Sequence, residues 1–120
     1  MLLMVIAAML AADRAPGLII ADVIALQASA TNPVPLQIAY RKCLADKTVE
    51  LGAGNSESAD TLLRGVAAVC LPVETALRAV YAKTPIGPAW TDRLMRLDRT
   101  QGEDDGVARL LAVRAARQPR

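Results

Sequence analysis

The hydrophobic positions in the middle of the chain recur with the period of an α-helix and form two segments separated by a polar turn. Pro35 fits the first turn of a helix, and Gly52-Ala53-Gly54-Asn55 is typical of a helix end at which glycine adopts the left-handed conformation. The first segment therefore predicts a helix over residues 35–51. Its apolar side chains share one side, namely Leu36, Tyr40, Cys43, Leu44 and Leu51.

The second segment keeps one apolar face throughout, without a change of phase. Ser56 or Ser58 can accept a hydrogen bond from the free amides at its start. Pro72 lacks an amide donor and should bend the helix locally. We therefore expect one helix over residues 58–83, kinked at Pro72 and antiparallel to the first. The alternative is two helices broken at Leu71.

A break at Thr84-Pro85-Ile86-Gly87-Pro88 precedes the C-terminal part of the chain, with Gly87 suited to a cap and Pro88 to a first helical position. Two short helices divided at Gly102 are predicted here, because Glu103-Asp104-Asp105 would complement the positive end of a new helix. The first helix carries an apolar face of Trp90, Leu94 and Leu97, and the second carries Arg109, Arg114 and Arg117.

The two cysteines indicate how the predicted hairpin is held. The midpoint between Cys43 and Cys70 lies in the turn at Ser56, so an antiparallel hairpin places both at the same height on the apolar faces. In an oxidising compartment they should form a disulfide, whereas in a cytosol they would stay reduced and behave as small hydrophobic residues. No segment indicates a strand. The sequence thus predicts an all-α protein in which residues 31–120 form a single small domain: a disulfide-linked hairpin plus two short helices.

The first 12 residues form an unbroken apolar run, MLLMVIAAMLAA, that is too short to cross a bilayer. It suits the hydrophobic region of a signal peptide, cleaved after Ala12 or as late as Ala30, so we expect no transmembrane span in the mature chain. A buried first helix or strand of a cytosolic protein is the alternative. Residues 17–30 are apolar nearly all round and, if retained, should pack on another surface.

The composition excludes several kinds of chemistry. With 53% hydrophobic and 22% charged residues the chain is typical of a globular protein rather than a disordered one. It has no histidine, which excludes Ser-His-Asp and Cys-His catalysis and histidine-ligated zinc or haem. We expect no catalytic residues, no metal site and no cofactor. A net charge of +2 is too small to indicate a polyanionic partner.

Three features taken together resemble a known type of protein: Tyr40-x-x-Cys43-Leu44, the Gly-Asn-Ser-Glu turn, and Ala67-Ala68-Val69-Cys70 followed by Leu77. The type is that of small, uncharacterised exported proteins of proteobacteria built on a two-cysteine helical hairpin. The resemblance covers about residues 36–82. It implies export and a disulfide but no activity, so no functional residues follow from it. The chain departs from the type in having no Lys or Arg before its apolar run.

We expect an exported, non-enzymatic helical protein, periplasmic or secreted, that acts as a binding or structural module for an unknown protein partner or by self-association. Its contact surface would be residues 17–30 or the face of Trp90, Leu94 and Leu97. The alternative is a cytoplasmic regulatory module that contacts nucleic acid or another anionic partner through its arginine-rich C-terminal part, which includes Arg109, Arg114 and Arg117. Nucleic acid is not the partner we expect, because aromatic residues are nearly absent.

Overall fold

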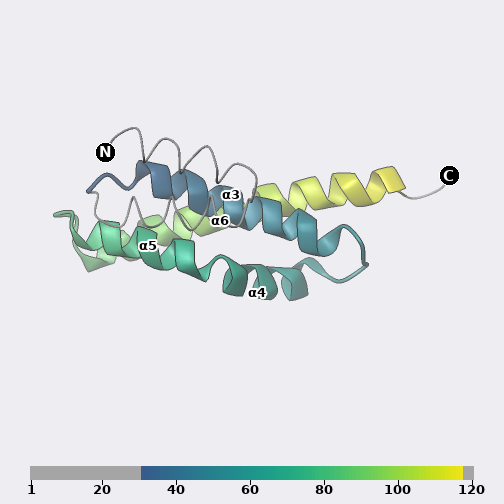
Figure 1. Ribbon diagram of the computed structural model, residues 1–120, viewed down its shortest axis with the longest axis horizontal. Coiled ribbons are helices and arrows are strands. Elements are labelled where there is room, and N and C mark those ends of the chain that lie inside the picture. The colour runs from purple at the N-terminus through teal and green to yellow at the C-terminus, as the bar shows by residue number, and fades with distance from the viewer. Residues whose placement is uncertain (1–30, 118–120) are drawn as a thin grey trace, which may run out of the picture.

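The computed structural model describes residues 31–117, and within this range the chain forms α-helices and no β-strand (Figure 1). The all-α prediction is therefore confirmed for this range. The expectations for residues 1–12 and 17–30, including the signal peptide, concern residues outside the described part. The helices are α3 (Val34–Gly52), α4 (Ala59–Val69), α5 (Leu71–Ala82) and α6 (Pro88–Arg117).

Helices α3 and α6 lie side by side and run in the same direction, and α4 and α5 run in the opposite direction along one side of this pair (Figure 1). The direction of α3 and α6 follows from their contacts. Gly102 lies against Arg41, Gly106 against Thr48, and Leu110 against Gly52, so both residue numbers rise together. The core lies where α3, α5 and α6 meet, and it is formed by most of the predicted apolar faces of the hairpin together with Met95 of α6.

A disulfide joins Cys43 of α3 to Cys70, the residue between α4 and α5, with an Sγ–Sγ distance of 2.17 Å and a Cα–Cα distance of 6.0 Å. Both cysteines are buried. The predicted hairpin and the predicted pairing at equal height are confirmed. Ser58 caps α4 by accepting a hydrogen bond from the amide of Thr61, as its position suggested.

The expectation of one kinked helix over residues 58–83 is wrong, and the alternative of two helices holds. The axes of α4 and α5 differ by 62°. The break lies at Cys70, whose backbone (φ −89°, ψ 2°) departs from helical geometry, one residue earlier than the alternative placed it. Pro72 explains the break, because it occupies the first turn of α5 and has no amide to continue the hydrogen bonds of α4.

The expectation of two short C-terminal helices is also wrong, because α6 is one helix of 30 residues that passes through Gly102. Gly102 is buried against α3, where a Cβ atom would lie 2.8 Å from Leu44 Cδ1 and 3.1 Å from Arg41 Cα. It serves close helix packing rather than termination. The acidic residues after it lie within the helix, where Glu103 pairs with Arg99 at 2.7 Å and Asp105 with Arg109 at 2.9 Å.

A similar correction applies at the end of α3. Gly52 does not adopt the left-handed conformation expected of it; in the described range only Gly87 has a positive φ (82°), and it directly precedes α6 as predicted. Gly52 is buried because Leu62 and Leu110 occupy the place that its Cβ would take, at 2.7 and 2.8 Å. Leu51, expected on the core face, is exposed.

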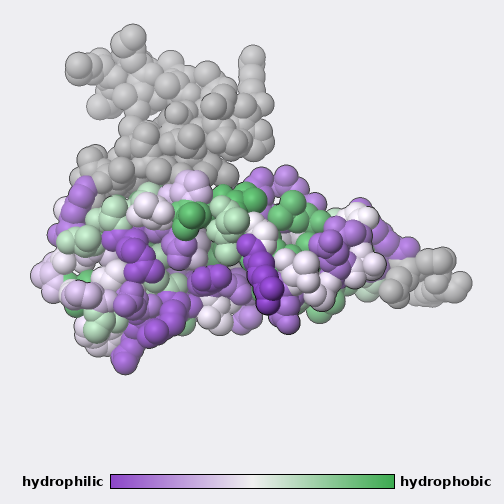
Figure 2. All heavy atoms as spheres, turned by 90° about the horizontal axis from the view of Figure 1, so that it is seen from below, coloured by the Kyte–Doolittle hydropathy of each residue, from purple (hydrophilic) through white to green (hydrophobic). Residues whose placement is uncertain are grey.

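No single helix within residues 31–117 is long and apolar enough to cross a membrane, although α4 and α5 taken together reach that length and composition. Their apolar face is already occupied, since Leu62, Val66, Val73 and Leu77 lie in the core. Figure 2 views the molecule from the side of α4 and α5, where polar side chains cover much of the surface and apolar ones interrupt it in places. Val69 and Leu71 are exposed apolar residues of this region.

Candidate interaction surface

The face that the sequence predicted on the first half of α6 is largely exposed. Trp90 is 56% exposed and Leu97 is 50% exposed, while Leu94 packs partly against the core. The side of α6 that is buried instead carries Thr91, Met95 and Asp98. Hydrophobicity alone therefore misassigns the orientation of this helix, and a buried polar cluster accounts for the difference.

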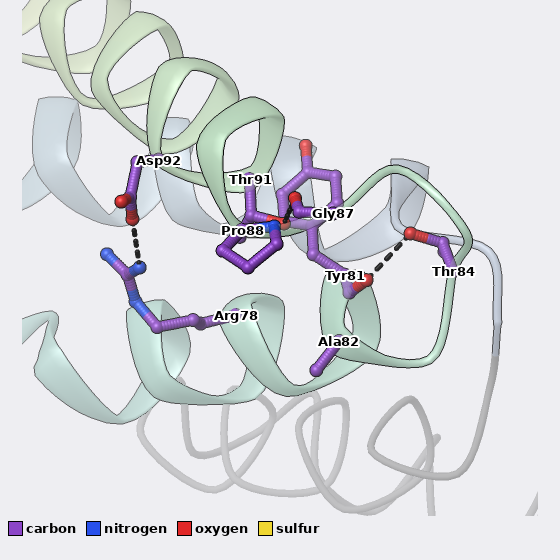
Figure 3. Close-up of a pocket in the computed structure, with 8 residues that line it drawn as sticks. All are labelled: Arg78, Tyr81, Ala82, Thr84, Gly87, Pro88, Thr91 and Asp92. Carbon is purple, nitrogen blue, oxygen red and sulfur yellow. Dashed lines mark hydrogen bonds and ion pairs between the residues drawn. The ribbon is translucent and has the colours of Figure 1, made fainter.

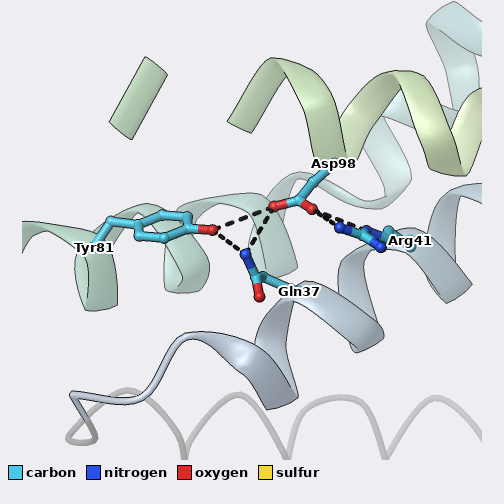
Figure 4. Close-up of polar contacts among 4 residues, drawn as sticks. All are labelled: Gln37, Arg41, Tyr81 and Asp98. Atoms are coloured by element: carbon cyan, nitrogen blue, oxygen red, sulfur yellow. Dashed lines mark hydrogen bonds and ion pairs between the residues drawn. The ribbon is translucent and has the colours of Figure 1, made fainter. Parts of the chain in front are cut away.

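Asp98 is the centre of this cluster and is only 1% exposed. Arg41 Nε donates to Asp98 Oδ1 at 2.9 Å, and the Tyr81 hydroxyl donates to Asp98 Oδ2 at 3.3 Å (Figure 4). The amide of Gln37 donates to Asp98 Oδ2 at 3.5 Å and also to the Tyr81 hydroxyl. The four side chains come from α3, α5 and α6, so the cluster fixes how the three helices are rotated against one another.

The cluster also has an electrostatic consequence. Burial raises the pKa of the Tyr81 phenol, and the nearby Asp98 carboxylate raises it further. Tyr81 therefore remains a neutral hydrogen-bond donor at physiological pH. Every buried side-chain N and O atom in the described range has a hydrogen-bond partner, so the buried polar atoms of the cluster are satisfied within the fold.

Sequence reasoning did not find this cluster, because Asp98 and Arg41 look like members of solvated helix faces. A signal was present in the spacing of Asp98, Gly102, Gly106 and Leu110. These positions recur every four residues, and two are glycines inside a long helix that requires close approach to a neighbour. Residues spaced in this way indicate a helix face that packs closely on α3 rather than a helix boundary.

Helix α3 adds two exposed apolar residues beside those of α6. Val34 is 50% exposed and Ile38 is 62% exposed. Arg41, Ala45 and Thr48 face α6, and Cys43 faces α4 and α5 through the disulfide. Helical geometry then places Val34 and Ile38 on the remaining side of α3, which points away from α5.

The same reasoning applies to α6. Asp98 and Gly102 face α3, and Asp92 pairs with Arg78 of α5 at 2.8 Å. Leu94 and Leu97 therefore lie on the side away from α5, and the α3–α6 register places them next to Val34 and Ile38. We call this surface the apolar flank; it consists of Val34, Ile38, Trp90, Leu94 and Leu97. Arg93 borders it and lies over the Trp90 ring at 5.0 Å.

The three C-terminal arginines singled out in the sequence do not join this flank, and each has contacts within the chain. Arg109 pairs with Asp46 at 3.4 Å and with Asp105 at 2.9 Å. Arg114 donates to the carbonyl of Gly52 at 3.1 Å, and Arg117 donates to the carbonyl of Ala53. Arg114 and Arg117 thus satisfy carbonyl groups at the C-terminal end of α3, where the helix dipole favours a positive charge.

A hollow of about 310 Å³ lies between the end of α5 and the start of α6 (Figure 3). Its lining includes Tyr81, Pro88 and Thr91, together with the exposed Arg78–Asp92 ion pair. The Tyr81 hydroxyl is engaged with Asp98, and the Thr91 hydroxyl donates to the carbonyl of Gly87 at 2.9 Å. The lining therefore offers no paired nucleophile and base of the kind that catalysis requires.

Within residues 31–117 no group of three or more His, Cys, Asp or Glu side chains is placed to hold a metal ion. Comparison of the chain with protein-family models, with curated proteins and with solved structures found no match. The apolar flank is the feature of the described residues that most resembles a binding surface, since four of its five residues are large, apolar and exposed and Arg93 borders it.

Proposed function

We propose that this protein is an exported, non-enzymatic helical module that binds a protein partner through the apolar flank. The observation that carries the proposal is the exposure of four large apolar residues on neighbouring helices, Val34, Ile38, Trp90 and Leu97. An apolar surface that includes a tryptophan and is bordered by Arg93 has the composition of the centre of a protein interface.

The disulfide supports the exported location. A bond between Cys43 and Cys70 persists in an oxidising compartment such as the periplasm or the extracellular space. The intact mass of the natively expressed protein, with and without thiol alkylation under denaturing conditions, tests this location. We expect a shortened chain that resists alkylation until it is reduced. A full-length chain that alkylates twice without reduction would contradict export.

The binding role is tested by placing a photo-reactive amino acid at Leu97 in the native host. We expect a discrete adduct between this protein and a partner protein. The matched control carries the same group at Arg64, which is exposed on α4 and lies outside the apolar flank. Adducts of equal yield at the two positions, or none at Leu97, would contradict the proposal.

No observation favours the alternative of an anionic partner held by Arg109, Arg114 and Arg117, because all three arginines make contacts within the chain. Each would have to give up these contacts to bind phosphate groups. The two proposals also differ in salt dependence, since binding to a polyanion weakens steeply as salt rises and binding to an apolar surface does not.

A further inference from the structure

We propose that the groove between α5 and the first half of α6 binds a small zwitterion, a molecule that carries a carboxylate and an ammonium group as free amino acids do. This groove is separate from the apolar flank, because the flank lies on the side of α6 away from α5. The binding of a zwitterion therefore does not depend on the proposed protein partner.

The groove has a volume of about 150 Å³, and charged side chains form most of its walls. The described residues that line it are Glu74 and Arg78 of α5 and Asp92, Met95, Arg96 and Arg99 of α6. Met95 is buried and lies at the floor. The Arg78–Asp92 ion pair, which lines both this groove and the hollow described above, separates the two (Figure 3).

The observation that points to a ligand is the hydroxyl group of Tyr40. Tyr40 is only 2% exposed, and its hydroxyl makes no hydrogen bond with any residue in the range 31–117. Since every fully buried side-chain N and O atom of this range has a partner, the Tyr40 oxygen must belong to the small part of the side chain that reaches the surface. The charges of Glu74 and Arg99 both act on the Tyr40 phenol, which places it beside these two walls of the groove. A polar atom without a partner in so deeply buried a side chain is suited to bind a ligand.

Three groups of the groove can donate hydrogen bonds to an anionic group. Burial, and after it the Glu74 carboxylate, raise the pKa of Tyr40 to about 12, so its phenol remains a donor at physiological pH. Arg96 has no ion pair or side-chain hydrogen bond within the described part of the chain. Arg99 is bound to Glu103 through Nε, which leaves its terminal amino groups available. Guanidinium groups and a phenol of this kind match a carboxylate.

Glu74 indicates that the ligand also carries a positive charge. Its carboxylate is only partly exposed and, among the described residues, has no ion pair. A simple anion would be repelled by Glu74, and a simple cation would be repelled by the arginines, which outnumber the acids of the lining by three to two.

A zwitterion resolves both conflicts. Its carboxylate accepts from Arg96, Arg99 and the Tyr40 hydroxyl, while its ammonium group donates to Glu74. The groove is smaller than the pockets of drug-sized ligands, which hold roughly 300–1,000 Å³, so the ligand is a small one.

The test is a titration of the full 120-residue chain, followed by NMR through the methyl group of Met95 at the floor of the groove. Met95→Leu identifies this signal among those of the four methionines. Glycine, β-alanine and γ-aminobutyrate present the two charges at increasing separation. Acetate and methylammonium present one charge each, at the same ionic strength.

We expect a saturable shift of the Met95 signal with at least one of the three amino acids. Its affinity should exceed those of acetate and methylammonium about tenfold or more, because only the zwitterion makes both charged contacts. Glu74→Gln and Arg96→Gln should each weaken its binding about tenfold or more, and Tyr40→Phe, which removes only the hydroxyl, about threefold to tenfold.

The matched controls are Glu57→Gln and Arg64→Gln, which make the same changes of charge at exposed positions outside the groove and should leave the affinity unchanged. Equal losses in these controls would overturn the proposal, since binding would then follow the overall charge of the chain.

The comparison among ligands uses the unaltered protein, so it holds whatever a substitution does to stability. The absence of a saturable shift with all three amino acids would overturn the proposal. Acetate or methylammonium binding as tightly as the best amino acid would overturn it as well and would identify a site for a simple ion.

Discussion

Two glycines inside α6 determine how closely the longest helix approaches α3. A Cβ atom at Gly102 would lie 3.1 Å from Arg41 Cα, and one at Gly106 would lie 3.0 Å from Ala45 Cα. Because these neighbours are backbone atoms, a side chain could fit only if the two helices moved apart.

Gly102→Ala should therefore lower the free energy of unfolding by about 1–3 kcal/mol, as overpacking in a closely packed contact does. Denaturant unfolding of the purified protein measures the change. Gly65→Ala is the matched control, since Gly65 lies inside α4 with open space around its Cα. There the substitution should stabilise the protein by about 0.5–1 kcal/mol through its helix propensity. Changes of the same sign at both positions would contradict the close-packed contact.

Also at the scale of the residue, Tyr40 should make the stability of the protein depend on pH. Burial, together with the nearby Glu74 carboxylate, raises the pKa of its phenol to about 12, above the ordinary value of 10. The contribution of Tyr40 is fully present below pH 10. Between pH 10 and 12 the unfolded chain releases the phenolic proton more readily than the folded one, so stability falls as pH rises through this window.

We expect the melting temperature to fall over that window and Tyr40→Phe to reduce the fall. The difference in phenolate absorbance between the wild-type protein and the Tyr40→Phe variant during a pH titration follows the same group, because Tyr81 also contributes to the absorbance of the wild type. Ionisation near pH 10 without any loss of structure would contradict the buried environment of Tyr40.

At the scale of the element, the C-terminal end of α3 receives hydrogen bonds from α6, a helix that is distant in sequence. The guanidinium of Arg114 donates to Gly52 O at 3.1 Å and to Asn55 Oδ1 at 3.3 Å. This adds to the 3.4 Å hydrogen bond that the Asn55 amide donates to the same carbonyl group, which no residue of α3 itself can reach.

Arg114→Ala should lower the free energy of unfolding by about 1 kcal/mol, because both the hydrogen bonds and the favourable charge at the helix end are lost. Hydrogen exchange should increase at the amides around residues 52–55. Arg64→Ala on exposed α4 is the control and should change stability by about 0.5 kcal/mol or less. Unchanged exchange around residues 52–55 in the Arg114 variant would contradict this capping role.

The elements show which parts of this fold could be predicted from the sequence. The hairpin was predictable, because apolar residues recur with helical spacing from Leu36 to Leu44 and the two cysteines lie at equal distances from the turn. The course of α6 was not. Gly102 followed by acids has the local pattern of a helix boundary, and only the surface of α3 shows that it is a point of contact.

The candidate surface was predictable in part. Trp90, Leu94 and Leu97 were identified as one face, but whether that face is covered depends on the orientation of α6. That orientation is set by Asp98, whose partners Gln37, Arg41 and Tyr81 come from two other helices. Such a cluster is a property of the assembled bundle, and no local pattern contains it.

At the scale of the whole molecule, the disulfide is the covalent link between the two sides of the hairpin. It closes a loop with a sequence separation of 27 residues. In the chain-entropy account, a loop of this size stabilises the fold by about 3–4 kcal/mol, a large share for a domain this small.

Cys43→Ser should therefore lower the melting temperature about as much as reduction of the wild-type protein does, as measured by thermal unfolding with and without reductant. The reductant should leave the melting temperature of the Cys43→Ser variant unchanged. Equal melting temperatures for the oxidised, reduced and variant proteins would contradict a stabilising role of the bond.

The parallel pairing of α3 with α6 has a consequence for the order in which the chain acquires its structure. The polar contacts between the two helices join residues from 57 to 63 positions apart. During synthesis α3 therefore leaves the ribosome long before the helix that completes its core contact exists. The side of α3 that packs on α6 therefore stays without its partner until the last of the described helices has been synthesised.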